Sequence, residues 1–400
     1  MAAVIGVYFS PPLQAVRALP DRLRVEGQAL AELPEMRNGG VLSMAGGSVR
    51  VDSRQDQRLS AAAGETVTYK LFGAIPIKTV EVVRAERVTL IPGGTAVGIT
   101  IRTEGVLVVG LGAVDTAAGA VSPGAAAGLR AGDMIVSADN QRIESAEQLM
   151  RIAASAGESL AMGVEREGQR MELTVRLVKS ASDGVLRMGL WVRDSTAGVG
   201  TLSFVDPGTG WFAALGHPVS DIDTQSLLPV REGRIVPTEI VDVKTGQQGS
   251  PGELVGVFSA AGPGLGKILV NSEYGIFGRM EQPYRNALYE SLPMGYCTEA
   301  RVGNAELLAT VSDGGIVAYA CEIVRVNPQT SAAVKGMIVD VTDQRLLNDT
   351  GGIVQGMSGC PVIQDGRLIG VVTHVFVNDP TRGYCVYAEW MRERILREAS

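Results

Sequence analysis

The sequence is poor in the residues that mark several common classes of functional site. Only two histidines occur in 400 residues, and the four cysteines have neither CxxC spacing nor histidines clustered around them. Such a chain offers no recognisable set of zinc ligands, and we expect no metal and no cofactor. The thiols all lie in the last third of the chain, and we expect them to be buried and free rather than joined in a disulfide.

Charge of one sign and long apolar runs are also missing. The formal net charge of −7 comes from 36 basic and 43 acidic residues. That balance creates no strong field for a polyanion, so we expect no nucleic-acid partner. No stretch is apolar over the ~20 residues that cross a bilayer. Residues 1–12 begin with MAAVIGVYF and end in Ser-Pro-Pro. We interpret them as the remnant of an anchor or signal segment, the alternative being a strand of the first domain.

Aromatic residues make up only 5% of the chain, whereas glycine is abundant, with 50 residues alongside 18 prolines. This composition favours turns and short strands over long helices. A hydrophobic content of 46% is enough for two or three domains with separate cores. We therefore predict a mostly β protein. Residues 13–90 alternate short apolar runs with turn residues, which indicates a small N-terminal β domain.

A more specific pattern begins at residue 91. Pro92-Gly93-Gly94 leads into an alternating strand, and the run SPGAAAGLRAGDMI follows at residues 122–135. Ser145, with Gln148 three residues later, forms a capping box that predicts the start of a helix. A pair of strands is expected to follow this helix.

On these motifs, residues 91–180 resemble the PDZ domains of bacterial proteases. The resemblance implies a groove that binds a peptide C-terminus or an internal segment by β-augmentation. Gly98, Ile99 and Thr100 are the residues expected to line it. The alternative is a PDZ fold used only for packing or autoinhibition.

The scarcity of histidine limits the choice of a general base for nucleophilic hydrolysis. His217 lies in WFAALGHP, where an apolar strand enters a polar loop. A histidine at such an edge can be held by the sheet on one side and face a substrate on the other. His217 is therefore the candidate base, and the alternative is a histidine that only satisfies its own loop.

The candidate nucleophile is Ser358, in the run QGMSGCP. Glycines close to a serine on both sides permit a tight turn whose amides point at one spot, as an oxyanion hole requires. We assign the two donors to the amides of Gly356 and Ser358. The loop, its proline and the hairpin after it resemble the nucleophile loop of trypsin-like proteases. Cys360 is the alternative nucleophile.

The hairpin leads to Thr373, His374 and Val375, which by the same resemblance lie along the bound substrate. Because strand side chains alternate between faces, Thr373 and Val375 share one side and His374 the other. We predict that His374 lines the substrate groove without transferring the proton. The alternative is a histidine packed against Phe376 or Trp390.

A carboxylate commonly fixes the tautomer of a catalytic histidine, and three aspartates are candidates. Asp221 and Asp223 follow His217 in the same loop, and Asp343 precedes Ser358 by 15 residues. Spacing along the chain does not choose among them.

Four motifs together resemble the stage IV sporulation protein B peptidases of endospore-forming bacteria. They are the Pro92-Gly93-Gly94 turn, GHPVSD at 216–221, GGIVQGMSG at 351–359 and THVFVNDPT at 373–381. The resemblance implies a chymotrypsin-like double β-barrel in residues 181–400 and a triad of His217, Asp343 and Ser358. Cys360 departs from the family, which usually has serine there.

The same resemblance implies a role and a place. Such enzymes are secreted between the forespore and mother-cell membranes and cleave a membrane-bound regulator of an intramembrane protease. That cleavage leads to processing of a sigma factor precursor, and the enzymes also cleave themselves. The alternative function is a catalytically inactive, PDZ-containing peptide-binding scaffold. A metal-dependent hydrolase is disfavoured because two distant histidines without an HExxH motif supply no ligand cluster.

Overall fold

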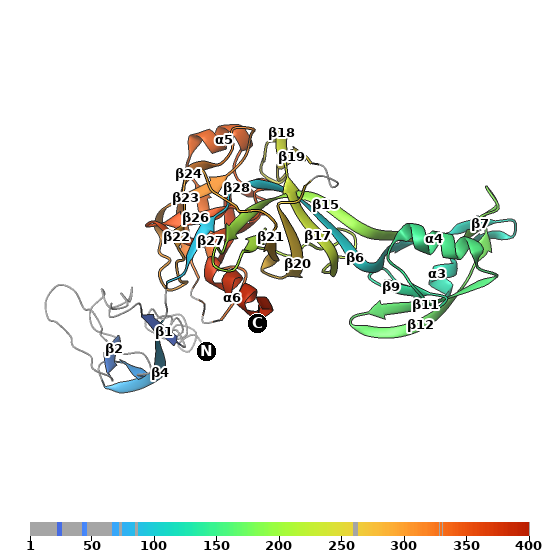
Figure 1. Cartoon of the computed structure of the whole chain (residues 1–400), viewed down its shortest axis with the longest axis horizontal. Helices are drawn as coiled ribbons and strands as arrows, with labels where there is room; N and C mark the ends of the chain where they lie inside the picture. The colour runs from blue at the N-terminus through green and yellow to red at the C-terminus, as the bar shows by residue number, and fades with distance from the viewer. Residues whose placement is uncertain are drawn as a thin grey trace, which may run out of the picture.

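The computed structural model describes residues 22–25, 42–45, 66–71, 74–84, 87–258, 263–327, 329 and 331–399. The proposed anchor remnant, residues 1–12, lies outside these ranges. Strands dominate the described chain, which forms a small N-terminal sheet, a central body and a third unit at the far end of a pair of long strands (Figure 1).

The N-terminal sheet has the strand order β1-β4-β3-β2. Its strands are β1 (Arg22–Val25), β2 (Leu42–Ala45), β3 (Thr66–Leu71) and β4 (Ile75–Arg84). β1 runs parallel to β4, and the other neighbours are antiparallel. Tyr69 and Val80 are buried.

The central body contains two closed barrels of six strands each. In the first, the order β6-β17-β20-β21-β16-β15 is closed by pairing of β15 with β6. These strands are β6 (Ala96–Leu111), β15 (Leu190–Val205), β16 (Trp211–Ala214), β17 (Val230–Pro237), β20 (Gly266–Ser272) and β21 (Gly275–Met280). Phe212, Leu202 and Ile235 are fully buried in its core, and β5 (Thr89–Pro92) and β22 (Leu292–Pro293) extend the sheet.

The second barrel has the order β23-β24-β25-β28-β27-β26. Its strands are β23 (Gly303–Ala309), β24 (Val317–Val326), β25 (Met337–Val341), β26 (Pro361–Gln364), β27 (Arg367–Phe376) and β28 (Asp379–Tyr387). Helix α5 (Gln344–Thr350) follows β25, and α6 (Ala388–Ala399) ends the described chain. The hairpin of β18 (Glu239–Lys244) and β19 (Glu253–Val257) lies beside this barrel, bridged to Gln355. The predicted double-barrel fold is confirmed.

The third unit is formed by the chain between β6 and β15. It contains β7 (Val114–Thr116), β8 (Gly119–Val121), α3 (Pro123–Ala126), β9 (Met134–Ala138), β10 (Gln141–Arg142), α4 (Ala146–Ser155), β11 (Ser159–Arg166), β12 (Gln169–Arg176), β13 (Val178–Lys179) and β14 (Leu186–Arg187). Ser145 caps α4 by accepting from the Gln148 amide, as the capping box predicts. The unit has a core of its own, including Ile135, Leu149 and Leu160.

The boundaries predicted around this unit need correction. Residues 96–103 belong to the first barrel, because β6 pairs with β15 over residues 96–102 and with β17 over residues 97–103. The unit therefore interrupts the first barrel instead of preceding the catalytic domain, and β6 and β15 run from the barrel into it (Figure 1). A glycine turn that enters an alternating strand looks the same in both folds, so the sequence pattern does not separate them.

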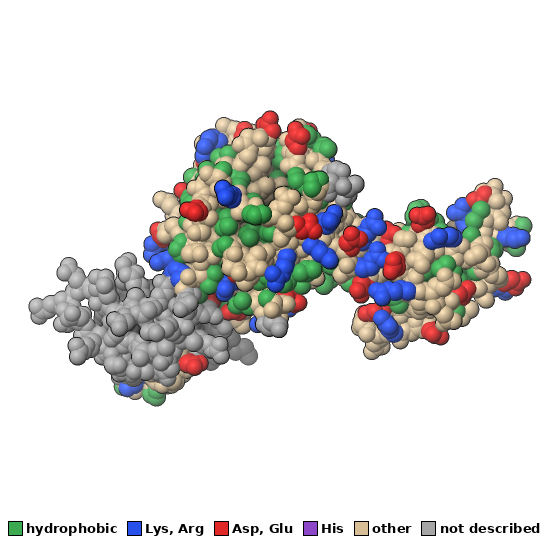
Figure 2. All heavy atoms as spheres, viewed as in Figure 1, with side chains coloured by type: hydrophobic (Ala, Val, Ile, Leu, Met, Phe, Trp, Pro, Cys, Tyr) green, Lys and Arg blue, Asp and Glu red, His purple; other side chains and the backbone are tan. Residues whose placement is uncertain are grey.

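Polar side chains gather where the two units join. Figure 2 shows basic and acidic side chains interspersed on this face, most closely at the narrow neck between the barrels and the inserted unit. Ion pairs at this neck include Arg231 with Glu144 and Arg193 with Asp221. Within the described residues, no helix is long and apolar enough to cross a membrane.

Candidate active site

His217 lies just after β16, in a turn that its own backbone constrains. Leu215 and Gly216 both have φ of +71°, so the chain bends sharply before the histidine. The Nδ1 atom of His217 lies 2.8 Å from the carbonyl oxygen of Pro218. A carbonyl only accepts, so Nδ1 carries the proton and Nε2 keeps a free lone pair. Burial lowers the pKa of His217 below its usual 6.5, which favours the neutral form that a base requires.

Ser358 lies half-buried in the loop between α5 and β26. Its hydroxyl donates to the carbonyl oxygen of Thr373 at 2.7 Å. Thr201 of the first barrel fixes this loop, because its hydroxyl donates to the Gly356 carbonyl at 2.8 Å and its amide to the Ser358 carbonyl at 3.0 Å. Gly356 has φ of +97°. Within the described residues, the amides of Gly356 and Ser358 donate to no other protein group, which leaves them available to an oxyanion.

The histidine turn and the nucleophile loop meet at two glycines. A Cβ on Gly359 would collide with the Thr201 carbonyl and lie 2.8 Å from the amide nitrogen of Leu215. A Cβ on Gly216 would lie 3.0 Å from Cγ2 of Thr373. These close approaches bring the backbone beside His217 against the backbone beside Ser358, at the junction of the two barrels.

His374 lies against His217, with ring centroids 4.9 Å apart and an angle of 39° between the planes. Its side chain is exposed, whereas Thr373 is buried. Although the residue is exposed, partial desolvation of its ring lowers the pKa of His374 to about 4, with smaller electrostatic contributions from His217 and Lys335. Because His374 is exposed and Thr373 is buried, the expected alternation of side chains along β27 holds for these two residues.

The other two residues expected to contact substrate face the second barrel. The Thr373 hydroxyl donates to the Tyr384 carbonyl at 3.1 Å, so only its backbone carbonyl turns toward Ser358. Val375 is half-buried and packs against the hydrophobic core of the body.

The structure does not bring Asp343 to His217. Asp343 caps α5, where its carboxylate accepts from the Arg345 amide at 3.0 Å, from the Arg345 guanidinium at 2.7 Å and from the Ala320 amide at 3.1 Å. Arg345 holds the pKa of Asp343 well below its usual range. Asp343 and Gly366 line the same surface hollow. Gly366 precedes Thr373 by seven residues, and seven residues of extended strand span about 23 Å.

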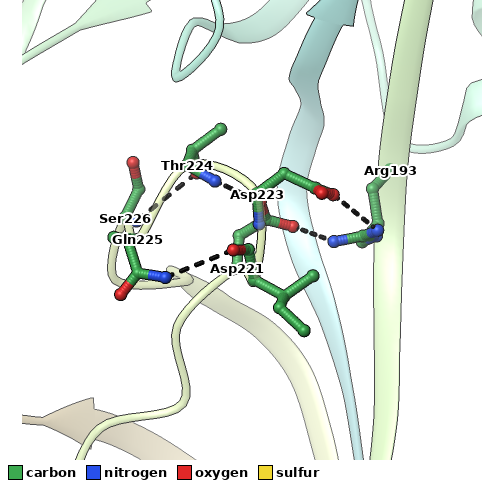
Figure 3. Close-up of polar contacts among 7 residues, drawn as sticks. Arg193, Asp221, Asp223, Thr224, Gln225 and Ser226 are labelled. Atoms are coloured by element: carbon green, nitrogen blue, oxygen red, sulfur yellow. Dashed lines mark hydrogen bonds and ion pairs between the residues drawn. The ribbon is translucent and has the colours of Figure 1, made fainter.

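The two rival aspartates also bind elsewhere. Asp221 and Asp223 both accept from Arg193 of β15 (Figure 3). Within the described residues, no carboxylate is hydrogen-bonded to His217, and the Pro218 carbonyl takes the place beside Nδ1.

The expected peptide-binding residues are also displaced. Gly98, Ile99 and Thr100 lie in the first barrel, where β15 pairs with one edge of β6 and β17 with the other. No edge is free there to accept a peptide. Residues 190–193 of β15 instead pair only with β6 within the described chain, and α4 packs against β14 and β15.

A short sequence signal could have located this second edge. Gly189, with φ of +67°, stands between the apolar residues Met188 and Leu190, in the short turn between β14 and β15. A hydrophobic-Gly-hydrophobic turn that enters a strand is the kind of loop that presents amides to a peptide carboxylate.

All four cysteines are free, as predicted, and three are buried as expected, whereas Cys297 is only half-buried. Cys360 is completely buried, and its thiol lies 3.6 Å from the hydroxyl of Thr201. Burial raises its pKa to about 12, so it is an inert thiol and not a nucleophile. No group of three residues that could hold a metal ion occurs in the part of the chain that the structure describes.

Sequence comparison identifies the family. The profile described as SpoIVB peptidase S55 matches residues 184–392, which is more than half of the 400-residue chain. The chain belongs to the SpoIVB peptidase S55 family. It is thus a serine peptidase. A PDZ domain profile matches residues 114–166, which lie within the inserted unit. A search of curated protein sequences gave no match.

Solved structures resemble parts of this S55 peptidase. The PDZ domain of an SdrC-like protein from Listeria monocytogenes is 20% identical, covers 22% of this chain and 87% of its own, and has a TM-score of 0.19. An inactive form of the Rv3671c protease of M. tuberculosis is 14% identical over 50% of this chain and 85% of its own, with a TM-score of 0.28. The HtrA-type protease AlgW with a decapeptide is 10% identical over 55% of this chain and 61% of its own, with a TM-score of 0.29.

Proposed function

We propose that this serine peptidase is an endopeptidase in which Ser358 is the nucleophile and His217 the general base. The observation that carries the proposal is the junction where the Ser358 hydroxyl, the unpaired amides of Gly356 and Ser358, and the turn that bears His217 come together. A base nitrogen with a fixed tautomer and two convergent donors are the parts that acyl transfer needs.

The reaction begins with rotation of the Ser358 hydroxyl from the Thr373 carbonyl toward Nε2 of His217. Serine rotamers interconvert readily, so this change is small. Oγ then attacks the peptide carbonyl carbon while Nε2 takes its proton, and the two amides bind the oxyanion. His217 returns the proton to the leaving amine as the C–N bond breaks. Water, activated in the same way, hydrolyses the acyl-enzyme and restores the serine.

Family membership supports a more specific role. The S55 peptidase would act outside the cytoplasm, between the forespore and mother-cell membranes, on a membrane-bound regulator of an intramembrane protease. That cleavage would lead to processing of a sigma factor precursor, and the enzyme would also cleave itself. The PDZ domain would bind a C-terminus or an internal segment of the protein substrate.

Labelling with a fluorophosphonate probe tests the nucleophile without knowledge of the substrate. We expect the purified full chain to be labelled at Ser358 and to shorten itself on standing. Ser358→Ala should abolish both, and His217→Ala should reduce both by several powers of ten. Cys360→Ser is the matched control inside the same loop and should retain labelling. A folded wild-type chain that is neither labelled nor shortened would instead be the inactive scaffold.

A further inference from the structure

Arg193 makes the ion-pair contact between the inserted PDZ unit and the loop that bears the proposed base. It leaves β15 and points between the carboxylates of Asp221 and Asp223 (Figure 3). Its guanidinium pairs with Asp221, and its second nitrogen lies 3.0 Å from Asp223. Both aspartates belong to residues 217–228, called here the histidine loop.

Asp221 organises the histidine loop from within. Its side chain is completely buried, and one carboxylate oxygen accepts from the amides of Asp223 at 3.0 Å and Thr224 at 2.9 Å. The other oxygen accepts from Arg193. Burial alone would raise the pKa of Asp221, but hydrogen bonds from Thr224 and Arg193 hold it below its usual value. A buried carboxylate that lost Arg193 would be left with an uncompensated charge.

A second contact fixes the loop to the first barrel. The Asn271 side chain of β20 accepts from the Val219 amide at 2.9 Å and donates to the carbonyls of Val219 and Leu228 at 2.7 and 3.0 Å. The histidine loop is therefore held at its base by the barrel and farther out by Arg193. His217 lies only two residues before Val219, so movement of the loop displaces the imidazole.

Arg193 stands where β15 passes from the PDZ unit to the barrel. It pairs with Leu107 in the ladder to β6, which is irregular between Arg193 and Ser195. The next residue, Asp194, accepts from the Ala146 amide at 2.9 Å, at the start of α4. Helix α4 packs along β14 and β15, next to the edge that is open at residues 190–193. Consecutive residues of one strand thus contact the PDZ helix and the histidine loop.

We infer that Arg193 is a positioning residue for catalysis, which couples the PDZ unit to the histidine loop and thereby sets the placement of His217. This inference rests on the proposed function of His217 as the base. A change in β15 or α4, such as a peptide added along the strand edge, alters the position of Arg193 and is transmitted through Asp221.

The rate of fluorophosphonate labelling measures base placement directly, because the probe reacts with Ser358 and does not require the PDZ unit for binding. In the full chain, we expect Arg193→Gln to lower the maximal labelling rate, kinact, by on the order of 10², as a misplaced catalytic group does. The probe concentration at half-maximal rate should not change. Arg193→Lys keeps the charge and should restore part of the rate. Arg301→Gln removes an exposed arginine–aspartate pair elsewhere and is the matched control.

A double-mutant cycle and hydrogen exchange test the two halves of the coupling. Arg193→Gln and Asp221→Asn together should lose no more labelling rate than the worse single variant, because both act through one pair. Asp194→Ala should increase amide exchange in residues 217–228 relative to wild type.

Unchanged kinact in folded Arg193→Gln, beside a reactive wild type, would overturn the inference and leave the proposed function intact. Unchanged exchange in Asp194→Ala would overturn the link to the PDZ unit, and absent labelling of the wild type would overturn the proposed function itself.

Discussion

At the scale of single residues, the unusual feature of the site is the group beside Nδ1 of His217. The Pro218 carbonyl fixes the tautomer, but it carries no full negative charge with which to stabilise an imidazolium. Burial lowers the pKa of His217, and the hydrogen bond to the Pro218 carbonyl offsets only part of that shift, whereas an adjacent carboxylate would raise the pKa further. In the proposed mechanism, catalysis would therefore depend more heavily on the backbone donors of the Ser358 loop.

The role of Asp343, which the family resemblance places in the triad, can be decided by one conservative substitution. Asparagine caps a helix about as well as aspartate, so Asp343→Asn preserves the start of α5 and removes only the charge. From the contacts with Arg345 and Ala320, we expect kcat to stay within about tenfold of wild type, well short of the ~10⁴ loss typical of a triad aspartate. The acid limb of kcat/KM should remain below pH 6.5, the ordinary pKa of histidine.

A fall of about 10⁴ in kcat for Asp343→Asn, with the fold unchanged by circular dichroism, would assign Asp343 to the triad. It would also mean that the active enzyme rearranges around α5. Asp340→Asn, which alters an exposed pair with Arg382 on the same barrel, is the matched control for loss of a carboxylate.

His374 has a different expected role. Its exposed ring lies against His217, on the strand whose Thr373 carbonyl accepts from Ser358. We expect His374→Ala mainly to raise KM, because a side chain that contacts the substrate equally in the ground and transition states contributes to binding alone. Separate measurement of kcat and KM decides the matter. Collapse of kcat with KM unchanged would make His374 the base.

At the scale of elements, the sequence predicted local features better than it predicted which strands are neighbours. The Ser145 cap follows from local residue chemistry, and the two barrels were expected from the resemblance to a known family. Both are confirmed. The place of residues 97–103 depends on their pairing with β17, which lies more than 100 residues later in the chain. Alternation within one strand carries no information about its partners. Asp343 illustrates the same limit, because a spacing of 15 residues does not specify the direction of a side chain.

The missed PDZ edge has a similar origin. Both β6 and β15 are 16-residue strands that serve two units at once, so one half of each belongs to a barrel and the other half to the PDZ sheet. A strand boundary marked by turn residues is easy to predict, whereas a domain boundary inside a continuous strand has no turn residues to mark it.

At the scale of the whole molecule, insertion of the PDZ unit into the first barrel makes the unit part of the catalytic body. Two strands cross the junction, and a small apolar cluster of Leu107, Met134 and Leu228 fills it. Leu107 and Met134 come from the PDZ side, and Leu228 closes the histidine loop. A domain on a flexible linker would have neither feature.

This cluster leads to a prediction about stability and motion together. Leu228 is almost completely buried, so Leu228→Ala should lower the free energy of unfolding by about 2–5 kcal/mol, the range for truncating a buried leucine. Because Leu228 also joins the loop to the PDZ unit, amide exchange should increase in residues 217–228. Leu160→Ala truncates a leucine buried in the PDZ core alone and should cost similar stability without changing that exchange. If both variants changed exchange in the histidine loop equally, loss of global stability would explain the result and the cluster would not be a specific joint.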